Sequence, residues 1–271
     1  MKNNILFITF DTLRYDVAKK LFDENKTPNI QKLIGKDGWE KRHTPGSFTY
    51  AAHQAFFAGF LPTPAKPGIH PRLFATRFLG SRTITKNTYV FDTPDIVSGL
   101  QQEGYQTICI GGVGFFSKQT PISSVFPNLF KESHWDKTYG VTDPNSTENQ
   151  FKKAAEILQQ MDKNQKVFLF INISAIHQPN YFYLNDGNAD NQEDTLESHA
   201  AALQYIDSQL PILIQALQKK GETFAIFSSD HGTTYGEDGY TGHRLAHPKV
   251  WEVPYKHFII GEKRDEGAGD E

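Results

Sequence analysis

The sequence of 271 residues contains a single cysteine, Cys109, so no disulfide can form within one chain. Cys109 lies in the apolar run 107–110, and we expect it to be a small buried hydrophobic residue. No apolar stretch approaches the roughly 20 residues that span a membrane. The first ten residues are typical of a strand and not of a signal peptide. From these absences we expect a soluble, cytoplasmic protein with no membrane segment.

A dominant charge is also absent. The 28 lysines and arginines nearly balance the 31 aspartates and glutamates, which gives a net charge of −3 with no long run of one sign. Because a strongly basic surface is what attracts nucleic acid or an anionic membrane, we expect neither as a partner. What the sequence does contain is 38% hydrophobic and 13% aromatic residues, the composition of a packed globular protein.

Apolar runs alternate with amphipathic segments along most of the chain. Predicted strands cover residues 5–10, 105–110, 167–171, 223–229 and 256–260. Predicted helices cover residues 28–34, 50–58, 95–102, 147–161 and 196–217. This alternation predicts an α/β fold with a mostly parallel central sheet and helices on both faces. No internal repeat or clear linker interrupts it, so we expect one domain over residues 1–261 and a polar tail over residues 262–271.

Prolines add local detail to this pattern. Pro28 fits the first turn of a short helix that Thr27 is able to cap. Pro211 is expected to kink helix 196–217 or to start a new segment there. Residues 61–88 differ in composition from the rest of the chain, since they combine several prolines with several basic residues. Such a segment is either a lid or binding loop or a solvent-exposed surface loop without a binding role.

Side chains that can bind metal or phosphate follow several of the predicted strands. Along the chain they are Asp11, the pair Gly111–Gly112, His177, and the pair Asp230–His231. The carboxyl ends of parallel strands meet at one edge of a sheet, where ligands bind. Taken singly, Asp11 is explained as a helix cap and His231 as an ordinary histidine beside a turn. Their convergence favours a divalent-cation site built from Asp11, Asp230 and His231.

Thr49 lies just before a predicted helix, where backbone N–H groups and the helix dipole favour an anion. A hydroxyl at such a position, coordinated to a metal, can ionise near neutral pH and attack phosphorus. The alternatives are that Thr49 is an ordinary N-cap and that Ser47 supplies the reacting hydroxyl.

Taken together, these motifs resemble those of the alkaline phosphatase superfamily, particularly its sulfatase-like and phosphodiesterase branches. The matching segments are residues 10–14, 27–29, 49–59, 104–107, 177–179, 229–232, 236–244 and 253–254. They follow the family's order and span most of the chain. The resemblance implies an alkaline phosphatase-like α/β sandwich and a metal-dependent hydrolase.

The residue ten positions before Gly59 distinguishes the branches of this superfamily. Sulfatases carry there a cysteine or serine that is oxidised to formylglycine, followed by proline and arginine at fixed offsets. This chain has Thr49, Ala51 and His53 instead, and threonine cannot become formylglycine. The segment is more similar to the threonine nucleophile region of nucleotide pyrophosphatase/phosphodiesterases. Phosphoethanolamine transferases and lipoteichoic acid synthases also use threonine, but usually outside the membrane, which the absent signal and spans disfavour.

The resemblance implies roles for individual residues. Asp11, Thr49, Asp230 and His231 match the ligands of one divalent cation, Zn or Mn, with Thr49 also the nucleophile. His177 and His243 match positions that contact substrate or a second metal. Two-zinc members use an Asp-x-x-x-His pair that is not found near His177, so a second metal is left open.

We therefore expect a hydrolase of phosphate mono- or diesters, acting on a small phosphorylated substrate through a metal-bound threonine. A phosphotransferase or sulfatase-like hydrolase of the same superfamily is the first alternative. A catalytically inactive metal-binding module is the second. Arg14, Arg244 and the basic residues of 61–88 either hold a distal anionic group of the substrate or are solvated surface charges.

Overall fold

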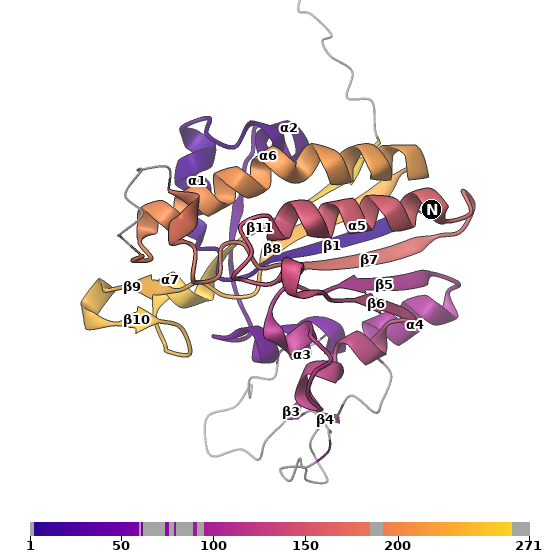
Figure 1. Ribbon diagram of the computed structural model, residues 1–271, viewed down its shortest axis with the longest axis horizontal. Helices are drawn as coiled ribbons and strands as arrows, with labels where there is room; N and C mark the ends of the chain where they lie inside the picture. Colours follow the sequence, from indigo (N-terminus) through magenta and orange to yellow (C-terminus); the bar gives the residue numbers. More distant parts are fainter. Residues whose placement is uncertain are drawn as a thin grey trace, which may run out of the picture.

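The computed structural model describes residues 3–59, 61, 74–75, 79, 89–90, 95–184 and 192–261. A seven-stranded sheet with the order β2-β11-β8-β1-β7-β5-β6 forms its centre (Figure 1). Its strands are β1 (Asn4–Phe10), β2 (Glu40–His43), β5 (Gln106–Ile110), β6 (Glu132–His134), β7 (Val167–Ile173), β8 (Thr223–Ser229) and β11 (Glu252–Ile260). The five strands from β8 to β6 run parallel, and β11 and β2 continue the sheet antiparallel at one edge. The predicted α/β fold with a mostly parallel sheet is confirmed.

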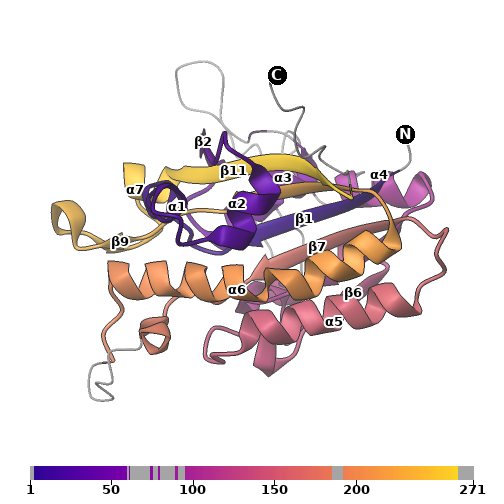
Figure 2. The same cartoon turned by 90° about the horizontal axis from the view of Figure 1, so that it is seen from above.

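Helices cover both faces of this sheet. On one face lie α1 (Tyr15–Asp23), α2 (Pro28–Ile34), α5 (Ser146–Gln160) and α6 (Leu196–Lys220), and on the other lie α3 (Thr49–Ala58) and α4 (Ile96–Gln102) (Figures 1 and 2). The short α7 (Pro248–Trp251) leads into β11, and the pairs β3 (Phe74–Ala75) with β4 (Tyr89–Val90) and β9 (Thr234–Tyr235) with β10 (Thr241–Gly242) stand apart from the main sheet. Within the described ranges, no helix is both long and apolar enough to cross a bilayer. Most of the segment 61–88 and the tail 262–271 lie outside the described residues.

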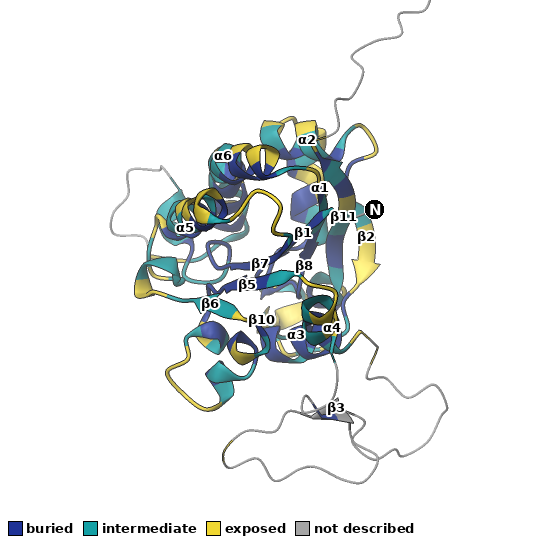
Figure 3. Cartoon of the chain, turned by 90° about the vertical axis from the view of Figure 1, so that its right-hand side faces the viewer, coloured by how far each residue is buried: buried dark blue, intermediate teal, exposed yellow. Residues whose placement is uncertain are grey.

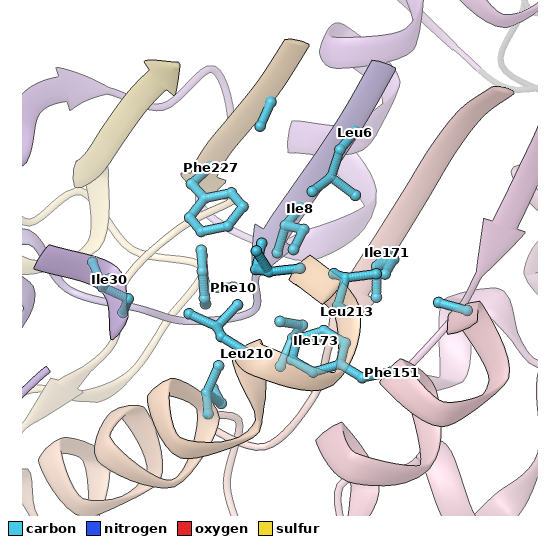
Figure 4. Close-up of a cluster of buried hydrophobic side chains, with 14 of the residues drawn as sticks. Leu6, Ile8, Phe10, Ile30, Phe151, Ile171, Ile173, Leu210, Leu213 and Phe227 are labelled. Atoms are coloured by element: carbon cyan, nitrogen blue, oxygen red, sulfur yellow. The ribbon is translucent and has the colours of Figure 1, made fainter. Parts of the chain in front are cut away.

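Each central strand contributes to two hydrophobic cores because successive side chains point to opposite faces. From β1, Leu6, Ile8 and Phe10 enter the larger core beneath α5 and α6, which Figure 4 shows in close-up. Ile5 and Phe7 face the smaller, aromatic core beneath α3 and α4. Burial on both faces explains why the central strands have nearly continuous apolar sequences. Figure 3 shows exposed residues on outer helix surfaces, on loops and on the edge strand β2.

The register of the parallel strands brings the predicted site residues to one edge of the sheet. Phe10 of β1 is paired with Ser229 of β8 on one side and with Ile173 of β7 on the other. The chain therefore leaves β1 at Asp11 and β8 at Asp230 side by side.

An aspartate from α6, and not Thr27, caps the start of α2. The Thr27 side chain makes no capping hydrogen bond within the described chain, so that prediction is wrong. Instead the Asp207 carboxylate accepts hydrogen bonds from the backbone N–H groups of Asn29 (3.2 Å) and Ile30 (2.7 Å).

The same contact explains why α6 does not break at Pro211. The proline has no N–H to donate to the carbonyl of Asp207, one turn earlier. The Asn29 side-chain amide donates to that carbonyl instead, at 3.0 Å. One helix therefore continues from Leu196 to Lys220, and the prediction of a new segment at Pro211 is wrong.

Replacing Asp207 by alanine removes a helix cap and leaves buried N–H groups unpaired. We expect Asp207→Ala to lower the free energy of unfolding by about 1–3 kcal/mol. Asp23→Ala removes the exposed ion pair with Lys19 and serves as the matched control, with an expected loss close to zero because solvent screens such a pair. Urea unfolding measures both variants. Equal effects would show that Asp207 does not hold α2.

Candidate metal centre

Asp230 follows the end of β8, and only one of its two carboxylate oxygens is hydrogen-bonded within the described residues. Its side chain is fully buried. Oδ1 accepts hydrogen bonds from the backbone N–H groups of Thr12 (3.2 Å) and His231 (3.0 Å). Thr12 can present its amide in this way because its backbone bends into the left-handed region, with φ of 65°. Oδ2 has no hydrogen-bond partner among the described residues.

Asp11, at the end of β1, repeats this arrangement. The side chain is fully buried, and its Oδ2 accepts hydrogen bonds from the Asn172 amide and the Thr49 hydroxyl, both at 3.3 Å. Oδ1 finds no hydrogen-bond partner in the described part of the chain. Each of the two neighbouring carboxylates thus presents one buried oxygen with unused lone pairs.

His231 directs one ring nitrogen at the two carboxylates. Its Nδ1 donates to the carbonyl of Gly232 at 2.8 Å, which leaves a lone pair on Nε2. Nε2 lies 3.5 Å from Asp230 Oδ2 and 3.9 Å from Asp11 Oδ1. The next position must be glycine, because a Cβ on Gly232 would lie 2.0 Å from the carbonyl oxygen of Lys249.

Thr49 is the first residue of α3, and Phe48 precedes it as the N-cap residue. The alternative that Thr49 is an ordinary N-cap is therefore wrong. Its hydroxyl oxygen lies 3.3 Å from both Asp11 Oδ2 and His231 Nε2. The structure thus brings together the four residues for which the sequence predicted a shared cation.

The chemistry of this group fits a divalent cation. Asp11, Asp230 and His231 offer ligand atoms that all lie within 4.8 Å of one another. Burial, together with the neighbouring charge of Asp230, raises the pKa of Asp11 to about 6, and burial raises the pKa of Asp230 to about 7. Two buried carboxylates with unpaired oxygens and an imidazole lone pair form an oxygen and nitrogen set that suits Zn²⁺ or Mn²⁺.

His177 and His243 lie beside this group. The His243 ring is centred 4.5 Å from that of His231 and 5.9 Å from that of His177. Burial, with contributions from the charges of His231, His177 and Arg244, lowers the pKa of His243 to about 3. At neutral pH it is therefore an uncharged imidazole. The two predicted histidines thus sit next to the four residues described above.

The two arginines proposed to hold a distal anion differ in environment. Arg14 is only 2% exposed and forms ion pairs with Asp16 at 2.7 Å and with Glu237. It is therefore not a solvated surface charge, and that prediction for it is wrong. Arg244 is exposed, and its guanidinium lies 5.4 Å from the ring centroid of Phe48, directly before Thr49.

Sequence reasoning missed two polar residues of the site. Asn172, near the end of β7, donates to Asp11, and His53, one turn into α3, contacts the backbone of Thr49. The available signal was a polar residue within an otherwise apolar strand or helix. That signal does not identify the partner, which lies far away in the sequence.

Comparison with known proteins places this geometry in a wider context. A model of the family described as Sulfatase matches residues 3–257. No curated protein matches the sequence significantly.

Similar solved structures include the C-terminal periplasmic domain of phosphoethanolamine transferase EptC from Campylobacter jejuni, with 17% identity and a TM-score of 0.62, covering 98% of this chain and 80% of that one. The lipoteichoic acid synthase LtaP from Listeria monocytogenes has 16% identity and a TM-score of 0.63, covering 94% of this chain and 65% of that one. The EptC domain from Escherichia coli in complex with Zn has 16% identity and a TM-score of 0.60, with coverages of 94% and 72%. At these identities the similarity shows a shared fold.

Metal should stabilise the protein more at high pH than at low pH. Raised pKa values mean that the metal-free folded protein gains stability from protons on Asp11 and Asp230. This gain is complete below the ordinary pKa near 3.8 and is lost as the pH rises through about 7. Above that pH the carboxylates are charged, and a cation offsets their repulsion.

We expect saturating Zn²⁺ or Mn²⁺ to raise Tm by roughly 5–10 °C at pH 8 and by clearly less at pH 5. Differential scanning calorimetry measures the shift, with Asp230→Asn as the variant in which it disappears. A shift that is larger at pH 5, or unchanged in Asp230→Asn, would contradict a cation site between the two carboxylates.

Proposed function

The chain belongs to the sulfatase family, and from this premise we propose that it hydrolyses phosphate mono- or diesters with Thr49 as the nucleophile. One observation carries the proposal: the Thr49 hydroxyl lies 3.3 Å from both Asp11 and His231, beside two carboxylate oxygens without partners in the described chain. Such a hydroxyl is poised for activation.

Different residues of the site have different roles in the proposed reaction. A divalent cation held by Asp11, Asp230 and His231 would supply Lewis-acid chemistry, lowering the pKa of a nearby hydroxyl and neutralising phosphoryl charge. Thr49 directs its hydroxyl hydrogen at Asp11 Oδ2, so that its oxygen is free to approach phosphorus. The N-terminal N–H groups of α3 favour the anionic phosphoryl group at the same place.

The proposed reaction has two displacements. Thr49 gives its hydroxyl proton to Asp11 Oδ2, and its Oγ bonds to phosphorus as the bond to the leaving oxygen breaks. The products are a phosphothreonine and an alkoxide, which takes a proton from water and leaves as an alcohol. His177 or His243 donates an N–H hydrogen bond to the leaving oxygen and steadies its charge. Water then attacks phosphorus, releases inorganic phosphate or a phosphomonoester, and restores the threonine.

The identity of the nucleophile favours phosphate over sulfate esters. Sulfatases of the family use formylglycine, which threonine cannot form, whereas a threonine oxygen forms a stable phosphoester. The exposure of Arg244 and its contact with Phe48 support a role for it in binding a second anionic group of a small phosphorylated substrate. A sulfatase-like hydrolase of another ester class remains the alternative within the family.

A phosphotransferase is the second candidate function. The names of two similar structures, a phosphoethanolamine transferase and a lipoteichoic acid synthase, favour it. In that reaction a hydroxyl of an acceptor, and not water, attacks the phosphothreonine. Product analysis with an added acceptor alcohol separates the two, because a transferase forms a new phosphoester and a hydrolase forms only the hydrolysis product.

Removing the Thr49 hydroxyl should abolish turnover. We expect Thr49→Ala to lower kcat for aryl phosphate mono- or diesters at least 10³-fold, while Thr49→Ser keeps measurable activity. Mass spectrometry after rapid quenching should locate a phosphoryl group on Thr49.

The control is Ser47→Ala, which removes the other candidate hydroxyl and should leave kcat nearly unchanged. Full activity of Thr49→Ala would rule out this nucleophile. A wild type that binds metal but neither turns over substrate nor traps phosphothreonine would favour an inactive metal-binding module.

A further inference from the structure

His53 lies one helical turn after Thr49 on α3, and its side chain is fully buried. Aromatic rings surround its imidazole at centroid distances from 5.3 to 6.1 Å, and they belong to Phe56, Phe57, Phe116, Phe126 and Phe170. A buried imidazole in such surroundings needs partners for its nitrogens. Both nitrogens have one.

The partners determine which nitrogen carries the proton. Nδ1 lies 2.7 Å from the backbone carbonyl oxygen of Thr49, and because a carbonyl only accepts, Nδ1 must donate. Asp230 Oδ2 is 3.8 Å from the same nitrogen, too far for a hydrogen bond. Nε2 therefore has a lone pair and accepts from the Thr9 hydroxyl at 3.0 Å. With both nitrogens engaged, His53 is neither a cation ligand nor the base for Thr49.

The contacts continue from Thr9 back to the carboxylate of Asp11. Asn172 is oriented by its Oδ1, which accepts the backbone N–H of Val113 at 3.1 Å. Its amide nitrogen consequently faces Thr9 Oγ and Asp11 Oδ2, each at 3.3 Å. Thr9 and Asp11 are two positions apart at the end of β1, so one strand anchors both contacts.

These hydrogen bonds close a ring of five buried residues. In order they are Asp11, Asn172, Thr9, His53 and Thr49. Thr49 is held twice in this ring, through its hydroxyl by Asp11 and through its carbonyl by His53. Because Thr49 and His53 belong to the same helix, rotation of α3 would break the contacts of Thr49 with Asp11 and of His53 with Thr9.

We propose that His53 is a positioning residue that ties the Thr49 carbonyl to Thr9 through an imidazole protonated on Nδ1, and so holds the Thr49 hydroxyl toward Asp11. This inference rests on the proposed function, since the orientation of Thr49 affects turnover only if Thr49 is the nucleophile.

The first test uses the unaltered protein and needs no turnover. Proton–nitrogen correlation spectra of isotope-labelled, metal-free protein report the tautomer of His53 directly. We expect a proton on Nδ1 and none on Nε2. A proton on Nε2, or on both nitrogens, would overturn the proposal.

The second test breaks the ring at Thr9 and compares a matched substitution elsewhere. Thr9→Val keeps the shape but removes the hydroxyl that donates to His53. Thr107→Val is the control, because Thr107 is also a buried threonine in a central strand, β5. Its hydroxyl oxygen accepts hydrogen bonds from the Gln101 side chain and from the backbone N–H of Lys131. We expect Thr9→Val to lower kcat about 10-fold to 100-fold with little change in KM, and Thr107→Val to leave kcat unchanged. Equal kcat values for two folded variants of similar Tm would overturn the proposal.

Variants of His53 itself test the role of each nitrogen. In His53→Asn the side-chain amide can take the place of Nδ1, whereas in His53→Gln it takes the place of Nε2. We expect His53→Asn to retain more of the wild-type kcat than His53→Gln, and the opposite order would contradict the assignment. If the wild type shows no turnover, the proposed function fails. The inference about His53 is then decided by its tautomer alone: a proton on Nδ1 supports it, and a proton on Nε2 rejects it.

Discussion

The site depends on two like charges that the fold places next to each other away from water. Parallel pairing of β1 with β8 aligns Phe10 with Ser229, so the residues that follow, Asp11 and Asp230, are neighbours. Each carboxylate gives one oxygen to hydrogen bonds from the protein and leaves one unpaired among the described residues. The ligand atoms of the two carboxylates lie within 4.8 Å of each other. Buried carboxylates this close are stable only with bound protons or a cation. Burial raises the pKa of both carboxyl groups, and the charge of Asp230 raises that of Asp11 further.

The remaining parts of the site are arranged around this pair. His231 follows Asp230 directly, and the close approach of Gly232 to α7 fixes the path of the chain there. Thr49 comes from α3, on the opposite side of the sheet from α5 and α6 (Figure 1). Because α3 packs into the aromatic core through residues such as Phe57, the position of its first turn is set by core packing as well as by hydrogen bonds. The site is thus built on strand ends and one helix terminus.

Much of this arrangement follows from the sequence, and the exceptions have physical reasons. Long apolar runs predict β1, β7 and β8 and their acidic or imidazole ends, because strands covered on both faces need continuous apolar residues. The edge strands β2 and β6 were not predicted, since Glu40–His43 and Glu132–His134 contain no apolar residue. The cap of α2 comes from Asp207, which is distant in sequence and invisible to local rules. For the same reason the sequence did not reveal that Arg14 is paired in the interior, or that His53 connects Thr49 to Thr9.

The most direct measurement is anomalous X-ray diffraction from crystals of the wild-type protein grown with Mn²⁺ or Zn²⁺. The account predicts one strong peak between Asp11 Oδ1, Asp230 Oδ2 and His231 Nε2, with the Thr49 oxygen adjacent and ligand distances of about 2.0–2.2 Å. No peak at this position under saturating metal, or a cation bound by other residues with Thr49 turned away, would contradict it.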